Sequence, residues 1–275
     1  MSEPLTPESQ PAPEKGVADI LVEAFQLYRA HAKPLLLTCA LLFVPAAIIN
    51  SMALSAILGP TLAIAGTGDP AAALAGSLSV YLLQLAGTLM TAFFLYGIVI
   101  PLTNGALTIA AADRILGGQA ESREVWMLLF RRLGKLLSAV IPAAIVVTIG
   151  FVFFLIPGLV LALFFSFVSP VVLIEGLGGR AALERSTTLV RADWLRVALL
   201  LVGIAAVGWV GHLVASLLVP RGSIFMASLV SDLTTMVMLP VPVLGTVLLY
   251  FDIRRKRDGF TNDNLRADLD ALKRA

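Results

Sequence analysis

Long runs without a charged residue set the strongest limit on how this chain can fold. One of them extends from Leu78 to Ala112. As one helix it would measure about 50 Å, which exceeds the roughly 30 Å hydrocarbon core of a bilayer. The whole chain is 58% hydrophobic and 14% charged, unlike an ordinary soluble domain. The sequence therefore predicts an all-α integral membrane protein.

Six apolar runs are predicted to be transmembrane helices. They extend over residues 34–58, 78–112, 136–156, 159–174, 197–219 and 233–251. The second run contains PLTNG at residues 101–105, so it is either one kinked helix or a re-entrant pair. Pro157-Gly158 is a turn signal that would join the third and fourth runs in a tight hairpin. Asp232 is either a cap at the start of the sixth run or an intramembrane acid.

The remaining segments divide the chain into a tail, a membrane domain and a final helix. Residues 1–16, rich in Pro, Ser and Glu, are predicted to be a disordered N-terminal tail. Residues 17–260 are predicted to form a single six-span membrane domain. Residues 261–275 are predicted to form a short, charged helix on the cytoplasmic side.

Three amphipathic stretches, at residues 17–33, 121–135 and 175–196, each precede a pair of apolar runs. They are predicted to be interfacial helices on the cytoplasmic surface of the membrane. The pattern indicates three repeated units of one surface helix and one helical hairpin. Basic, amphipathic loops before membrane spans would produce the same pattern without any repeat, and both interpretations remain open.

The positions of the cations predict the orientation of the chain. With six spans, 19 of the 20 Lys and Arg residues fall on the side of both termini, and Arg221 falls on the other. Cytoplasmic loops collect Lys and Arg, so both termini are predicted to be cytoplasmic. A seventh span at residues 101–105 would scatter the cations over both sides. The cations of Arg254 to Arg257 would orient the last span and contact anionic lipid.

Four charged residues near the ends of the fourth and sixth spans are predicted to form structural ion pairs at the cytoplasmic interface. They are Glu175, Arg185, Asp252 and Arg254. Carboxylates that are half-buried at the end of a span are costly unless they are paired. The pairs would clamp the third surface helix to the bundle, and residues 250–260 would extend the last span and dock against that helix.

One arginine from each of the three units is a candidate contact for a lipid phosphate. These residues are Arg29, Arg131 and Arg191. A guanidinium group presents a fork of donors that is well shaped for phosphate. The sequence leaves open whether the three residues converge on one site.

Two segments resemble a known family. The stretch IPGLVLALFFSFVSPVVLIEGLGGRAALERSTTLVRADWLRV, residues 156–197, contains a Pro-Gly hairpin, a Glu-Gly pair, an Ala-Leu-x-Arg-Ser helix and a Trp-x-Arg step. Together with LLYFDIRRKRDGF at residues 248–260, it resembles the glycerophosphodiester phosphodiesterase membrane-domain family and related uncharacterised bacterial multi-pass families. The resemblance implies a shared helical fold in the bacterial inner membrane, and most members have no assigned activity. The catalytic barrel that is fused to some members is absent here.

The sequence contains no pattern that is typical of a catalytic or cofactor site. The two histidines, His31 and His212, are predicted to lie on opposite faces of the membrane, and Cys39 is the one cysteine. Hydrolysis would need clustered carboxylates and histidines, so we expect no enzyme, no cofactor and no metal site.

The expected function is that of a non-catalytic membrane module that binds anionic lipid head groups on the cytoplasmic side or partner membrane proteins, including a second copy of itself. Nucleic acid is not expected as a partner. The alternative is a transporter or flippase for a lipid or an amphiphile.

Overall fold

The computed structural model describes residues 15–65, 78–219 and 223–274, and every regular element within these ranges is helical. Six helical segments are long and apolar enough to cross a membrane, which confirms the predicted number. They are Ala32–Gly59, Gln84–Ile115, Leu133–Phe151, Leu155–Glu175, Trp194–Leu217 and Ile224–Asp258. Arg221 and nearly all of the predicted tail at residues 1–16 lie outside the described residues.

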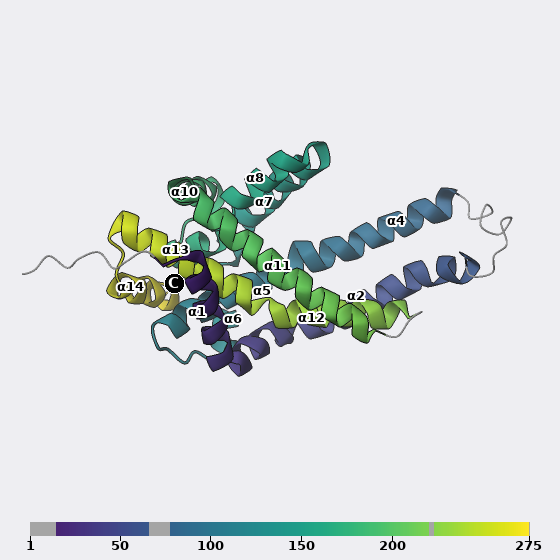
Figure 1. Ribbon diagram of the computed structural model, residues 1–275, viewed down its shortest axis with the longest axis horizontal. Coiled ribbons are helices and arrows are strands. Elements are labelled where there is room, and N and C mark those ends of the chain that lie inside the picture. Colours follow the sequence, from purple (N-terminus) through teal and green to yellow (C-terminus); the bar gives the residue numbers. More distant parts are fainter. Residues whose placement is uncertain (1–14, 66–77, 220–222, 275) are drawn as a thin grey trace, which may run out of the picture.

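Figure 1 shows how the helices are arranged. Their bounds are α1 Val17–Ala30, α2 Ala32–Ala65, α4 Leu78–Ala92, η1 Phe93–Val99, α5 Ile100–Ile115, α6 Ser122–Arg131, α7 Leu133–Phe153, α8 Leu155–Phe164, α9 Val168–Pro170, η2 Val171–Glu175, α10 Gly179–Ala192, α11 Trp194–Leu218, α12 Ile224–Met238, α13 Pro240–Asp258 and α14 Asn262–Arg274. The segments η1 and η2 are π-helical.

The shorter helices α1, α6, α10 and α14 gather at one end of the molecule, and the long apolar helices extend away from them (Figure 1). We call this the charged end. In chain order, α1, α6 and α10 each precede a pair of candidate spans. α1 packs against α13, α6 against α2 and α5, and α10 against α7 and α13. These contacts tie the ends of the spans to one another.

The second candidate span follows one continuous helical path, and its irregular turn lies before Pro101 rather than at residues 101–105. α4 continues through η1 into α5, where Pro101 occupies the first turn. Proline cannot donate a hydrogen bond to the carbonyl four residues earlier, and its ring crowds that carbonyl. That residue is Gly97, within the π-helical segment. A wide turn accommodates this conflict. The segment is therefore one helix with a π-helical turn rather than a re-entrant pair.

The hairpin between the third and fourth spans turns at Phe154, so the predicted turn at Pro157-Gly158 is wrong. Phe154 is extended, with φ −155° and ψ 122°, and separates α7 from α8. Pro157 lies in the first turn of α8. A backbone N–H has no partner within the helix at this position, so proline costs no helical hydrogen bond there. A Cβ atom on Gly150 would lie 2.9 Å from the Cα of Gly158, so both glycines are needed for the close approach of the two helices.

The last candidate span begins at Ile224, before its predicted start, and this changes the role of Asp232. The side chain of Ser223 caps α12 by accepting a hydrogen bond from the N–H of Met226 at 3.2 Å. Asp232 lies in the interior of α12, so the predicted cap is wrong. The residue is 6% exposed and accepts a hydrogen bond at 2.9 Å from Nδ2 of Asn50 on α2. The alternative interpretation, an acid within a span, agrees with this position.

The C-terminal helix α14 is charged, as predicted, but it also packs into the core. Leu265, Leu269 and Leu272 are between 0% and 6% exposed and belong to the main hydrophobic cluster. Their spacing places them on one face of the helix. α14 contacts η2, and Nη1 of Arg131 donates a hydrogen bond to the carbonyl of Lys273 at 2.5 Å. The helix is therefore part of the charged end.

The Gly150–Gly158 contact predicts the effect of a single methyl group. In Gly158→Ala, the new Cβ would lie 2.7 Å from the backbone nitrogen of Phe151, so α7 and α8 must separate. We expect a lower melting temperature in detergent, corresponding to about 1–3 kcal/mol of overpacking. The control is Gly208→Ala in α11, where a Cβ atom meets nothing within 4 Å. Equal melting of the two variants would show that the glycine contact does not hold the hairpin.

Candidate functional site

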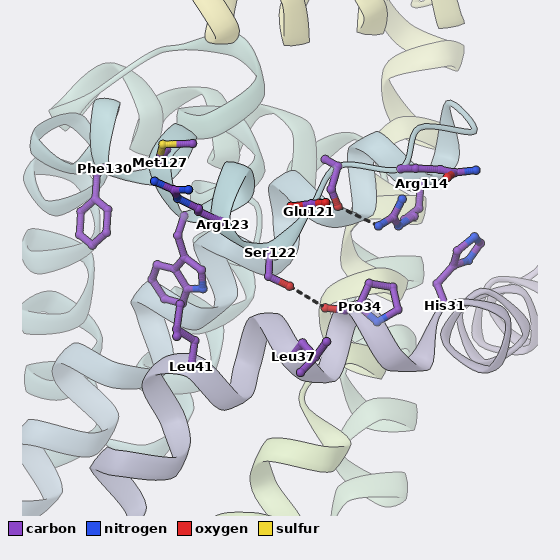
Figure 2. Close-up of a pocket in the computed structure, with 13 residues that line it drawn as sticks. His31, Pro34, Leu37, Leu41, Arg114, Glu121, Ser122, Arg123, Met127 and Phe130 are labelled. Atoms are coloured by element: carbon purple, nitrogen blue, oxygen red, sulfur yellow. Dashed lines mark hydrogen bonds between the residues drawn. The ribbon is translucent and has the colours of Figure 1, made fainter.

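A groove of about 920 Å³ lies at the charged end between the beginning of α2 and α6 (Figure 2). Its lining residues come from α2, from the end of α5, from the loop between α5 and α6, and from α6 itself. Ligand sites are typically concave and mostly apolar, with a few polar groups that orient the ligand. The groove is therefore the first candidate for a binding site.

Hydrogen bonds fix α6 to α2 beside the groove. The hydroxyl of Ser122 donates to the carbonyl of Pro34 at 3.3 Å, as Figure 2 shows, and accepts a bond from the hydroxyl of Thr38 at 3.0 Å. Nε1 of Trp126 donates to the carbonyl of Thr38 at 3.1 Å. These bonds connect the first turn of α6 to the first turns of α2 and so set the distance between the two helices.

The walls of the groove are apolar. Leu37 and Leu41 on α2 are 54% and 62% exposed, and Met127 and Phe130 on α6 are 51% and 59% exposed. Within each pair the residues are three or four positions apart, so they share one helix face. Exposed apolar side chains of this size on two adjacent helices suit a hydrocarbon chain better than water.

Basic side chains and the carboxylate Glu121 form the polar part of the groove. Arg123 extends from α6 beside Met127, whereas His31 lies between α1 and α2, on the other side of Pro34 (Figure 2). Arg123 is exposed and enters no ion pair within the described part of the chain. Arg114 donates to the carbonyls of Gly118 at 2.5 Å and Ala120 at 2.9 Å, and so shapes the loop before α6. Arg123 is thus the guanidinium group that can meet an anionic ligand.

The three arginines predicted to contact lipid phosphate lie on α1, at the end of α6, and on α10. All three are exposed. Arg131 is bonded to the carbonyl of Lys273 on α14. The guanidinium of Arg191 lies 5.8 Å from the centre of the Phe164 ring. Each arginine thus has its own surroundings, and no contact joins these three within the described residues.

The structure places Glu175, Arg185 and Arg254 together. Nε of Arg185 lies 2.9 Å from Oε2 of Glu175, and Nε of Arg254 lies 3.7 Å from its Oε1. The hydroxyl of Tyr250 donates to Oε1 of Glu175 at 2.7 Å. Arg185 also pairs with Asp258. We call Glu175, Tyr250, Arg185, Arg254 and Asp258 the Glu175 cluster.

Asp252, the fourth predicted member, lies in a different pair. Its Oδ2 accepts a hydrogen bond at 2.5 Å from Nη2 of Arg196, which also pairs with Asp193 at 2.7 Å. Arg196 was not among the predicted residues. It stands at the start of α11, where its side chain joins that helix to α13.

Opposite charges offset the effect of burial on Arg185. Burial lowers the pKa of Arg185, but the hydrogen bonds and charges of Asp258 and Glu175 outweigh burial and raise this pKa above its ordinary value. Asp268 on α14 lies 3.6 Å from Nη1 of Arg254. Burial raises the pKa of the Asp268 carboxyl, and the charge of Arg254 only partly offsets this effect.

The sequence analysis did not identify the groove. A signal was present, because Arg123, Met127 and Phe130 are spaced to share one face of the predicted surface helix. The same spacing would be found if this face simply rested on the bilayer. The α2 wall, which turns the face into a groove, comes from a distant part of the chain.

The Glu175 cluster predicts a matched pair of substitutions. Glu175→Gln removes the charge that faces Arg185 and Arg254, so we expect a lower melting temperature, corresponding to about 1–3 kcal/mol. The control is Glu184→Gln, whose partner Arg180 lies 2.6 Å away in an ion pair with side chains 62% and 90% exposed. Such surface pairs contribute at most about 1 kcal/mol. If both variants melt alike in detergent, Glu175 does not stabilise the charged end.

Comparison with known families gives one match. Residues 125–251 are similar to a domain of unknown function, DUF7847. This range extends from α6 into α13 and leaves out α2, which forms the other wall of the groove. No curated protein and no solved structure matches the chain. The match is consistent with the expected uncharacterised family, but no link to the glycerophosphodiester phosphodiesterase membrane-domain family is found.

Proposed function

We propose that this chain is a non-catalytic, multi-pass membrane protein that binds one anionic membrane lipid in the groove between α2 and α6. The observation that carries the proposal is the combination of four exposed apolar side chains with Arg123, which enters no ion pair among the described residues. The acyl chain would lie along Leu37, Leu41, Met127 and Phe130. The phosphate would accept hydrogen bonds from Arg123.

The two parts of the groove contribute differently to such binding. The acyl chain of a lipid that enters from the bilayer moves from one apolar environment to another. The apolar walls therefore position the chain but contribute little hydrophobic binding free energy. A phosphate near Arg123 would gain a charge-assisted hydrogen bond, and this favours anionic over zwitterionic lipids. The guanidinium should therefore determine selectivity, whereas the walls determine position.

The proposal includes a location and an orientation. The charged end would face the cytoplasm, with α1, α6 and α10 at the membrane surface as the first helices of three repeated units. The concentration of cations on this side supports that orientation. The bacterial inner membrane and kinship with the glycerophosphodiester phosphodiesterase membrane-domain family rest on the resemblance of residues 156–197 and 248–260. Partner membrane proteins, or a second copy of the chain, remain part of the proposal.

A transporter or flippase is the second candidate, and the Asn50–Asp232 pair favours it. Ionisable side chains within membrane spans often belong to transport pathways. Asp232 is 6% exposed and lies in the last candidate span. Transport of lipid by the purified chain in liposomes, with loss in Asp232→Asn, would support this candidate over a binding module.

The lipid-binding proposal is tested by photo-crosslinking. The full chain is placed in nanodiscs that contain a photoactivatable phosphatidylglycerol. We expect labels to map to α2 and α6, and Arg123→Gln to reduce labelling several-fold because the charge-assisted bond is lost. The matched control is Arg180→Gln, since Arg180 is exposed on α10 and does not line the groove. Equal labelling of the two variants would refute a lipid site at Arg123.

The orientation is tested separately with reporter fusions. A reporter that is active only outside the cytoplasm is attached at the N-terminus, near Arg123, near Arg185 and at the C-terminus. We expect all four fusions to be inactive, because the cations on this side resist translocation. Activity at any of the four positions would contradict the proposed six-span orientation.

A further inference from the structure

A second cavity lies between helices of the candidate spans and shares no lining residue with the groove. Its volume is about 140 Å³, and its lining residues come from α5, the region from the end of α8 to α9, and the region from the α12–α13 junction into α13. All these regions belong to candidate spans. Half of the lining residues described by the structure are polar, and none of them is ionisable. Its polar members are Asn104, Thr108, Ser166, Ser169 and Thr246.

We propose that this cavity is a binding site for an alkali-metal cation, held by uncharged oxygen atoms. The backbone beside the cavity is interrupted in two places. The helical path is interrupted between α8 and α9 and between α12 and α13, and Pro170 and Pro242 follow these interruptions and line the cavity. A proline donates no hydrogen bond to the carbonyl four residues earlier, which for Pro170 belongs to Ser166. In membrane proteins, interrupted helices use such carbonyls to coordinate cations.

The two threonine hydroxyl groups of the lining donate their protons to carbonyls within their own helices. Thr108 donates its hydroxyl proton to the carbonyl of Asn104 at 2.8 Å, and Thr246 donates to the carbonyl of Pro242 at 2.8 Å. Each hydroxyl has one proton and two lone pairs. Since both protons are used within the helices, these threonines offer lone pairs to a ligand. The lining therefore favours a cation over an anion.

Two polar atoms of the lining residues lack a hydrogen-bond partner among the described residues. Oδ1 of Asn104 and Oγ of Ser166 are buried and have no hydrogen-bond partner among the described residues. Leaving a buried acceptor without a partner costs free energy. A bound cation would satisfy the Asn104 acceptor and the lone pairs of the serine together.

The size and charge of the cavity fit the same ligand. Uncharged oxygens can replace part of the hydration shell of Na⁺ or K⁺. One water molecule takes up about 30 Å³ in the liquid, so 140 Å³ leaves room for a cation with a few retained waters. Because no carboxylate lines the described cavity, a divalent cation would lack the charged oxygen ligands that it prefers.

The experiment measures cation binding to the purified full chain in detergent. The probes are NaCl and KCl, each compared with choline chloride at the same ionic strength. We expect Na⁺ or K⁺ to raise the melting temperature with saturation, and equilibrium dialysis with radioactive Na⁺, or with radioactive Rb⁺ in place of K⁺, to show one saturable site per chain. No difference from choline together with no saturable binding would overturn the proposal and leave a cavity that contains only water.

The variants are Thr108→Val and Thr246→Val, which remove the lone pairs and nearly keep the side-chain shape. We expect each to lower cation affinity about tenfold or more, a loss that removing even a supporting group can cause in a metal site. The control is Thr103→Val, because Thr103 donates the same kind of bond, to the carbonyl of Val99 at 2.8 Å, but does not line the cavity. The control should keep the affinity even if it melts lower. Unchanged affinity in both cavity variants would place the cation elsewhere and overturn the assignment.

Discussion

The carboxylate of Glu175 is the interaction on which the charged end depends. It stands at the end of η2, accepts a hydrogen bond at 2.7 Å from Tyr250 on α13, and lies 2.9 Å from the guanidinium of Arg185 on α10. A half-buried carboxylate without such partners would destabilise the folded state. The packing of η2, α10 and α13 around Glu175 supplies these partners. Arg254 extends the assembly, because it contacts Glu175 and also Asp268 on α14. Through these contacts α10, α14, η2 and the end of α13 form one unit, and the hydrogen bond from Arg131 to the carbonyl of Lys273 connects this unit to α6 beside the groove.

Away from this end the helices are held by a different kind of contact. In hydrocarbon, each backbone polar group needs a partner within the protein, and close approach through small residues such as Gly150 and Gly158 replaces ion pairing. The irregular turns at η1, between α8 and α9, and at Leu239 are exceptions to regular helix geometry. Two of these three border the 140 Å³ cavity, half of whose lining residues are polar. Regular helices thus surround a region of interrupted backbone, as expected where broken helices serve a site rather than the fold alone.

The sequence was sufficient for features that depend on local composition. Charge-free runs predicted six spans because the length of an apolar segment is a property of that segment, and the α13 extension to Asp258 with Gly259 in the left-handed region, φ 62°, agrees with the predicted continuation of the last span. Partners distant in sequence could not be predicted. Asp232 follows a serine as a cap would, and the residue that decides its role, Asn50, is 182 positions away. Asp252 likewise pairs with Arg196, which no local pattern indicated. Pro157 predicts a turn in the sequence, but proline is also favoured in the first turn of a helix.

The hydrogen bonds around the groove favour binding over catalysis as the proposed activity. A nucleophilic hydroxyl needs a base within hydrogen-bond reach, but the Ser122 hydroxyl donates to the carbonyl of Pro34 and accepts from Thr38. The proton of Ser122 is thus used in the bond to the carbonyl of Pro34, which helps to hold α6 against α2. Removing this proton to activate the hydroxyl would break that bond. Arg114 is similarly occupied by the carbonyls of Gly118 and Ala120. The guanidinium of Arg123 lies beside the apolar walls and enters no ion pair among the described residues. Such a group can hold a phosphate but does not readily exchange protons with it, so the arrangement suits retention of an anionic lipid rather than its chemical conversion.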